Sequence, residues 1–247
     1  AIGYQSLKNN TASLNVGIGA NTLRDNTTGY ANSAIGNDAL RFNTTGYENA
    51  AWGVEALLNN NTGYRNMAIG QIAMQANTIG HRNIAVGGGA LSENVSGNFN
   101  ACIRDATMIL NTTGSFNTAV GPLALHTNTS GDYNTAIGHY ADVSSGNLTN
   151  ATAIGNGTIV NSSNKIRLGN TSVTVVEGNA SYTVSDGRFK TDLKQNVPGL
   201  DFITRLQPVT YHFDYPAFSN FIGERIVDRA CLEIRKGKVE AGFVAQQ

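Results

Sequence analysis

One short phrase recurs along the first 155 residues at a fixed interval of 17. The phrase is Ala, then Ile or Val, then Gly, and from Ala34 it returns at positions 51, 68, 85, 102, 119, 136 and 153, with Cys102 replacing one alanine. Two earlier copies begin at Ala1 and Gly17, one residue closer together. Because such units stack only on their neighbours, we expect a rod of similar coils and no central pocket.

Composition narrows the classes of function. Of 247 residues only 14% are charged and 28 are glycine, which is unusual for a soluble enzyme, and a net charge of zero gives no reason to expect a nucleic-acid partner. No apolar run approaches the ~20 residues of a membrane span, so none is expected. Since Ala1 already lies in a repeat, we expect the chain to be a piece of a longer protein. Cys102 and Cys231 lie in different regions, and we expect no disulfide between them.

Two columns of bulky apolar residues predict the core. One follows the alanine of the phrase, and the other lies five positions further on, after a small residue. The candidate core residues are Ile35, Leu40, Ile69, Val86, Leu91, Val120, Leu125 and Ile137. Two large apolar side chains per coil make a thin core for one chain. We therefore expect an oligomer in which the chains share an apolar seam.

Two further columns are glycine and asparagine. Glycine after Asn-Thr-Thr predicts a turn with positive φ, at Gly29, Gly46, Gly63, Gly80, Gly97, Gly114 and Gly131. Stacked side-chain amides can form a hydrogen-bonded ladder. The predicted ladder is Asn32, Asn49, Asn66, Asn83, Asn100, Asn117 and Asn134. Each coil is expected to run strand, turn, strand, turn.

Departures from the repeat give weaker signals. Arg104 and Asp105 replace the glycine and the residue after it, which predicts a surface Arg–Asp pair in a decayed repeat, or else a ligand-contact patch. An aromatic column shifts by one position between Tyr64 and Phe99, which predicts that the stripe changes sides if it lies on a strand. The three histidines at 81, 126 and 139 are out of phase, so no metal site is expected.

The repeated phrase A-I-G-x-x-A-L with N-T-x-G-x-x-N-T resembles the head repeats of trimeric autotransporter adhesins and of bacterial and phage tail-fibre proteins. The resemblance covers residues 1–155, although the period of 17 is longer than the commonest one of these repeats. It implies a mainly β fold in which three chains each wind a β-roll and pack apolar edges on a common axis. The implied partners are two further copies of the chain.

After residue 155 the period ends and the composition changes. Alternating apolar and polar residues around Val173 and Val184 predict a β-rich neck over 156–184. Residues 185–247 are expected to form a small α+β domain, with a short helix after Pro198 and a strand that includes Val209 and Tyr211.

The opening of this last segment resembles the endosialidase-type intramolecular chaperone of phage tail spikes and fibres. The matching stretches are Ser185–Lys190, Gly199–Ile203, Leu206–Tyr211 and Gly242–Gln246. The resemblance implies a domain that trimerises, guides the fibre into register and then cuts the chain at its own start. It implies that Ser185 is the nucleophile, that Lys190 is its partner and that the Ser185–Asp186 bond is cut. Because the last motif is followed by only one residue, we expect a partial chaperone domain.

This chemistry is reasonable for these residue types. A serine needs a base, and a lysine can serve when burial or a neighbouring cation such as Arg188 lowers its pKa. The alternative is a plain turn at Ser185 with a solvated lysine.

Three functions remain. The first is an extracellular trimeric fibre or adhesin, of a virion tail or a bacterial surface, that attaches to a host cell through an unidentified cell-surface or polysaccharide receptor. The second is a serine peptidase that acts only on its own chain. The third is a ligand-binding solenoid for polysaccharide or ice. None of the three calls for a cofactor.

Overall fold

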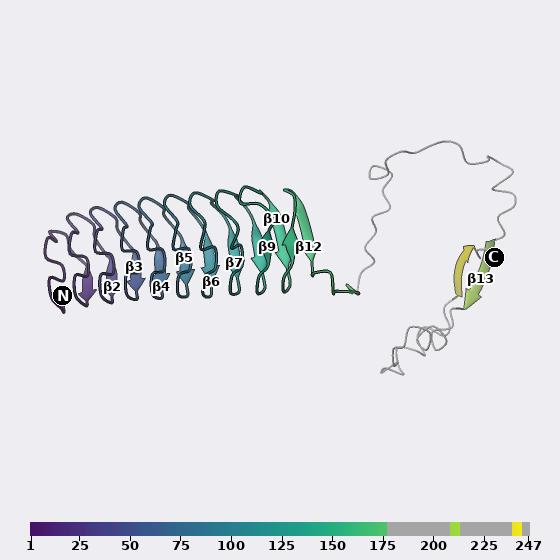
Figure 1. Cartoon of the computed structure of the whole chain (residues 1–247), viewed down its shortest axis with the longest axis horizontal. Helices are drawn as coiled ribbons and strands as arrows, with labels where there is room; N and C mark the ends of the chain where they lie inside the picture. Colours follow the sequence, from purple (N-terminus) through teal and green to yellow (C-terminus); the bar gives the residue numbers. More distant parts are fainter. Residues whose placement is uncertain (177–207, 213–238, 244–247) are drawn as a thin grey trace. The chain divides into compact units, whose positions relative to one another are not determined.

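The computed structural model describes residues 1–176, 208–212 and 239–243. The chain divides into two compact units, Ala1–Glu177 and Gly178–Gln247, and each is described by itself. The first unit is a β-solenoid in which successive coils lie side by side along one axis (Figure 1). Ser33 pairs with Ala50 and Ala50 with Met67, so each regular coil advances the chain by one period of the repeat. The mainly β solenoid predicted from the period is confirmed.

One strand from each coil joins a ten-stranded parallel sheet. In order the strands are β1 (Val16–Ile18), β2 (Ser33–Ile35), β3 (Ala50–Trp52), β4 (Met67–Ile69), β5 (Ile84–Val86), β6 (Ala101–Ile103), β7 (Thr118–Val120), β8 (Thr135–Ile137), β10 (Ala151–Ile154) and β12 (Lys165–Leu168). The coils shorten at both ends of the sheet. Ile2 bridges Ile18, and Ala151 pairs with Lys165, and both separations along the chain are shorter than the regular period.

Only one side of each regular coil is a strand, and the expectation of two was wrong. On the other side Asp38 and Leu40 have left-handed φ angles of 57° and 51°. The Leu40 N–H nevertheless donates to the Ala56 carbonyl of the next coil at 3.0 Å. This wall is therefore held by hydrogen bonds between coils without strand geometry. Within the described residues, a second parallel pair, β9 (Asp142–Val143) with β11 (Ile159–Val160), appears only near the end of the solenoid.

The interior is narrow because a small residue points into it from each of the strands β1 to β8. Side chains alternate along a strand, so the middle residue of each three-residue strand faces inward. Ala34, Ala51 and their equivalents are fully buried there. The opposite wall contributes a second small residue and one large aliphatic one. The large buried side chains are Leu23, Leu40, Leu57, Met74, Leu91, Met108 and Leu125.

The same alternation places part of the expected core on the outside of the single chain. Leu40, Leu91 and Leu125 lie inside the coil at 0% exposure. Ile35 and Ile137 flank the inward alanine, so they face outward and are 39% and 43% exposed. The three remaining members are half-buried at the same outward position: Ile69, Val86 and Val120. These five side chains are available to a partner.

Two rows of asparagine run through the solenoid, one more than expected. In the expected row, Asn49 Nδ2 donates to Asn32 Oδ1 at 3.1 Å and to the Gly63 carbonyl at 2.9 Å. The other row contains the asparagine three residues before each glycine of the turns, such as Asn43 before Gly46. There Asn43 Nδ2 donates to Asn26 Oδ1 at 2.6 Å, one coil earlier. The members of this second row are Asn26, Asn43, Asn60, Asn77, Asn94, Asn111 and Asn128, all fully buried.

The two rows meet at the last regular coil. Asn134 is the final residue of the first row, and its Nδ2 donates to Asn128 Oδ1 at 3.2 Å and to the Leu148 carbonyl at 2.7 Å. In each preceding coil, the Oδ1 of the second row accepts from the next asparagine of its own row, as Asn111 Oδ1 does from Asn128 Nδ2 at 2.9 Å. The last acceptor of the second row is therefore occupied by the first row.

The glycines after Asn-Thr-Thr are needed for space, and the prediction of positive φ was wrong. A Cβ on Gly46 would lie 2.4 Å from Asn43 Oδ1 and 2.4 Å from the Gly63 carbonyl oxygen. The positive φ falls on the glycine of the repeated phrase, with 127° at Gly36. The lack of a Cβ on Gly46 and its equivalents in the turns therefore lets each turn pack closely against the second asparagine row.

Strand β12 pairs with β10, so the sheet continues through Leu168, into the segment expected as a neck. In the second unit, β13 (Pro208–His212) pairs antiparallel with β14 (Val239–Phe243). The strand predicted at Val209 and Tyr211 is β13. The helix predicted after Pro198 lies outside the described residues.

Candidate functional sites: the outer sheet face and the C-terminal segment

The outer face of the sheet carries a continuous apolar stripe, here called the sheet face. It consists of the first and third residues of strands β1 to β8 and Ile154 of β10, and none of these residues is charged. The main column consists of the third residues of β1 to β8 and the last residue of β10: Ile18, Ile35, Trp52, Ile69, Val86, Ile103, Val120, Ile137 and Ile154. Trp52 is the largest, is 45% exposed, and donates from Nε1 to Ser33 Oγ at 3.2 Å. An apolar stripe of this length is typical of a surface that binds another protein.

A column of aromatic rings follows the flank of the sheet face that precedes the strands, and its neighbouring rings are stacked except for the edge-on pair His81 and Phe99. Neighbouring centroids lie 4.6 to 5.6 Å apart. The rings belong to Tyr30, Tyr47, Tyr64, His81, Phe99, Phe116 and Tyr133. The expected change of sides does not occur. Phe99 has a φ of 55°, so it lies in a left-handed bend and its ring still reaches His81, whereas the predicted flip requires a strand.

The one-residue shift of the rings has a hydrogen-bonding consequence. It frees the earlier position for short polar side chains that accept backbone N–H groups from the preceding coil. Asn98 Oδ1 accepts from the His81 N–H at 2.9 Å, Ser115 Oγ from the Asn98 N–H at 3.0 Å, and Asp132 Oδ1 from the Ser115 N–H at 2.7 Å. The three coils after His81 thus keep the ring column and gain a polar ladder beside it.

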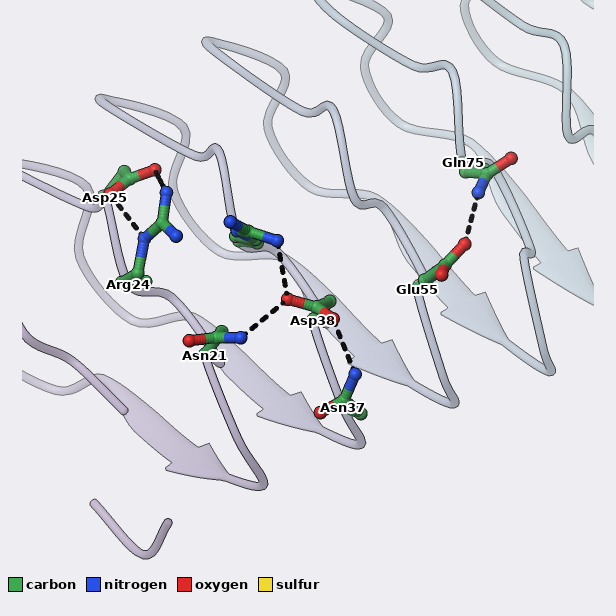
Figure 2. A network of polar contacts seen from close by, with 8 residues as sticks. Asn21, Arg24, Asp25, Asn37, Asp38, Glu55 and Gln75 are labelled. Carbon is green, nitrogen blue, oxygen red and sulfur yellow. Dashed lines mark hydrogen bonds and ion pairs between the residues drawn. The ribbon is translucent and has the colours of Figure 1, made fainter. Parts of the chain in front are cut away.

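Polar side chains gather in the first coils, on the flank that follows the strands (Figure 2). Arg24 pairs with Asp25 at 2.6 Å, and the hydrogen bond from Arg24 holds the pKa of Asp25 below its ordinary value. Asp38 Oδ1 accepts from Arg41 Nη1 and from Asn21 Nδ2, each at 3.1 Å. The carboxylates drawn here have partners in their own chain. Asp25 and Asp38 are thus neutralised by arginines, whereas Glu55 accepts from the neutral amide of Gln75.

The irregular coil at residues 102–105 differs from the expected Arg–Asp pair. Asp105 Oδ1 accepts from the Gly88 N–H at 2.8 Å, and the described residues contain no ion pair with Arg104. Arg104 has a φ of 109° at a position where the neighbouring coils have glycine. Cys102 is fully buried in place of alanine, and burial raises the pKa of its thiol. This coil is a strained repeat without a nucleophilic site.

The threonines of the turns bond to their own chain. Thr27 Oγ1 donates to the Thr44 carbonyl of the next coil at 2.9 Å, and Thr78 and Thr112 repeat this contact with Val95 and Thr129. These hydroxyls brace the stack of turns. The row is also interrupted by Asn61 and Val95. It is therefore a poor template for an ordered surface ligand.

Asp142 is a buried carboxyl where the regular coils end. It accepts from the Thr127 N–H at 3.1 Å, from Thr127 Oγ1 at 2.8 Å and from the Val143 N–H at 2.8 Å. Desolvation outweighs these bonds and raises the pKa of Asp142. The donors to Asp142 all come from β9 and the preceding coil. Asp142 therefore stabilises the point at which the second wall changes from left-handed turns to the strand pair β9 and β11.

No group of three or more His, Cys, Asp or Glu side chains suited to a metal occurs among the residues with described positions. In that same part of the chain no helix has the length and hydropathy that crossing a bilayer requires. The predicted catalytic residues Ser185 and Lys190 lie outside the described residues. Their relative geometry stays a prediction.

Stacked coils, an apolar outer stripe and internal amide rows define a β-solenoid body of the kind found in fibres. Residues 185–247 match the family described as the chaperone of endosialidase. The chain thus consists of a β-solenoid repeat region followed by a segment that matches the model of the endosialidase chaperone family. The match begins at Ser185, the residue predicted as the nucleophile. Comparison with curated proteins gave no match.

Proposed function

We propose that this chain is the structural and adhesive body of a homotrimeric fibre whose assembly is guided by its C-terminal chaperone segment. The observation that carries the proposal is the sheet face. Large apolar side chains such as Ile35, Trp52 and Ile137 remain 39–45% exposed although they recur in every coil. A single chain leaves this surface in water.

Three parallel copies cover the sheet face by turning it toward a common axis. In a closed assembly with threefold rotational symmetry all contacts between chains are identical, so each chain uses the same apolar stripe. The number three rests on the resemblance to trimeric fibre heads and on the match to the endosialidase chaperone. The fibre acts outside the cell, on a virion tail or a bacterial surface, and attaches to a cell-surface or polysaccharide receptor.

Native mass tests this function. One chain has a mass of 26.1 kDa, and light scattering on the full chain should give three times this value. Replacing Ile35 and Ile137 by Glu should disrupt the trimer, because six carboxylates would be desolvated at the axis. Ile79→Glu is the matched control, since Ile79 is 55% exposed and lies outside the sheet face. A monomeric parent, or a trimer that tolerates both axial substitutions, would refute the proposal.

Self-cleavage is a second function, favoured by the start of the family match at Ser185. In this proposal Lys190 accepts the hydroxyl proton as the Ser185 oxygen bonds to the carbonyl carbon of the Ser185–Asp186 peptide. The proton passes to the departing Asp186 amino group, and water then hydrolyses the ester that remains. A denaturing gel should show a large and a small fragment, and Ser185→Ala and Lys190→Met should each abolish both. Arg188→Lys keeps a cation nearby and serves as the control. Fragments that persist in Ser185→Ala would exclude this nucleophile.

A solenoid that binds ice or polysaccharide along its length is not favoured. The turn threonines donate to backbone carbonyls, and the stacked rings cover one another's faces.

A further inference from the structure

We infer that the interface between chains extends beyond the sheet face to both of its flanks, with the ring column of one chain closing on the opposite flank of the next chain. The inference rests on the proposed trimer and concerns residues that the apolar stripe does not include. The ring flank precedes each strand, for example Phe116 before β7, and the opposite flank follows it, for example Leu123 after β7.

Symmetry brings unlike flanks together. When three rods turn the same face toward a threefold axis parallel to their length, the leading edge of one face meets the trailing edge of the next. Because this rotation includes no translation along the axis, residues at the same height in neighbouring chains face each other. Phe116 of one chain therefore meets Pro122 and Leu123 of its neighbour, and Tyr133 meets Tyr140.

At β7 and β8 both flanks are apolar or aromatic at positions that carry ion-paired charges in earlier coils. On the ring flank, Glu48 is paired with Arg65 at 2.6 Å, and the equivalent positions four and five coils later are Phe116 and Tyr133. On the other flank, Asp38 is paired with Arg41 at 3.1 Å, and the equivalent positions five and six coils later are Leu123 and Tyr140. Both edges of the sheet face are therefore uncharged at these positions in this part of the rod.

Exposure shows what remains for a neighbour to cover. Phe116, Tyr133 and Tyr140 are 46%, 57% and 45% exposed in one chain. Phe116 and Tyr133 stack on each other at 5.0 Å, so the ring faces are shared and the ring edges remain free. Aromatic edges pack well against other ring faces and aliphatic side chains. Tyr140 and Leu123 of the neighbouring chain supply such surfaces.

Cysteine cross-linking of the full chain tests this contact. The background carries Cys102→Ala, which restores the residue of the other coils, and Cys231→Ser. Phe116→Cys is combined with Leu123→Cys and treated with a short bifunctional maleimide, which avoids the narrow geometry of a disulfide. We expect covalent trimers on a denaturing gel. Tyr133→Cys with Tyr140→Cys is the second pair and should give the same product.

The matched control combines Phe116→Cys with Asn37→Cys. These positions lie on the same two flanks but five coils apart, about 24 Å at ~4.8 Å per strand, and should not cross-link between chains. The native mass of each untreated variant is measured alongside. A native trimer that yields no covalent trimer from either matched pair overturns the flank contact and leaves the trimer standing. Cross-linking of the control pair equal to the matched pairs also overturns it, while a monomeric background refutes the trimer itself.

Discussion

The side-chain amide of Asn60 donates to Asn43 Oδ1 at 2.7 Å, one coil earlier, and both side chains are fully buried. Asn60 also donates to the Gly63 carbonyl at 2.9 Å and accepts from Asn77 Nδ2 at 2.7 Å. Each member of the row thus ties a turn to the coils on either side. The row gives the solenoid polar cohesion where its apolar core is thin.

Asn60→Ala should lower the free energy of unfolding by at least about 2 kcal/mol. The substitution leaves buried groups on Asn43, Asn77 and Gly63 without partners, and each unsatisfied group costs about 1–3 kcal/mol. Urea unfolding at one protein concentration measures the change. Asn59→Ala, at the exposed neighbouring position, should have little effect. Equal losses in the two variants would contradict a structural role for the buried row.

Gly46→Ala should destabilise the solenoid by about 1–3 kcal/mol, because a Cβ there would overlap Asn43 Oδ1 and the Gly63 carbonyl oxygen. Gly88→Ala is the matched control. A Cβ on Gly88 would approach only Asp105 Oδ1, at 3.7 Å. The midpoint of thermal unfolding should fall for the first variant alone. An unchanged midpoint in Gly46→Ala would mean that the turn has more room than described.

Arg104→Gly should stabilise the protein by about 1 kcal/mol. Arg104 holds a φ of 109°, which is costly with a Cβ, and the equivalent Gly121 has 125°. Arg104→Lys keeps the strain and the charge, and should leave stability unchanged. The comparison of the two by urea unfolding separates the backbone effect from the loss of the guanidinium. Stabilisation by lysine would assign the cost to the side chain.

Asp142 should make stability depend on pH. Because burial raises its pKa in the folded state, its contribution is fully present below the unfolded pKa of about 3.9 and is lost as pH rises through the folded value. Asp142→Asn removes the titrating group, so its free energy of unfolding should fall less than that of the parent between about pH 4 and pH 7. Denaturant curves at both pH values give the difference. Parallel profiles for the two proteins would exclude Asp142 as the source.

The period alone predicted the stacked coils, because an apolar phrase that returns at one fixed short interval is buried most simply when each copy packs on the copy before it. The register of one period between neighbouring strands agrees with this. The number of strands per coil could not be predicted in the same way. Leu40 has a φ of 51°, a conformation that leucine rarely adopts in isolation. It is held there by its N–H bond to Ala56 and by burial. The left-handed conformation of Leu40 is thus caused by contacts with neighbouring coils, and the local sequence around Leu40 does not indicate it.

The direction of the strand side chains was equally hidden. In Ser33-Ala34-Ile35 either the alanine or its two neighbours can face inward, and size alone favours isoleucine as the core residue. The narrow interior accommodates Ala34, and Ile35 faces outward. The second asparagine row was visible at the same period in Asn26 and Asn43, but such residues are also common in turns. Hydrogen-bond geometry was needed to tell a ladder from a turn preference.

The contact between Asn134 and Asn128 determines where the second asparagine row ends. Every amide in the second row points its Nδ2 toward the amino-terminal end, so the row is polar and could in principle be prolonged without limit. Asn134 fills the acceptor at which the next unit would attach. The buried amide row is therefore closed at its carboxyl-terminal end by a side chain of the same polypeptide, while the parallel sheet continues beyond it through β10 and β12.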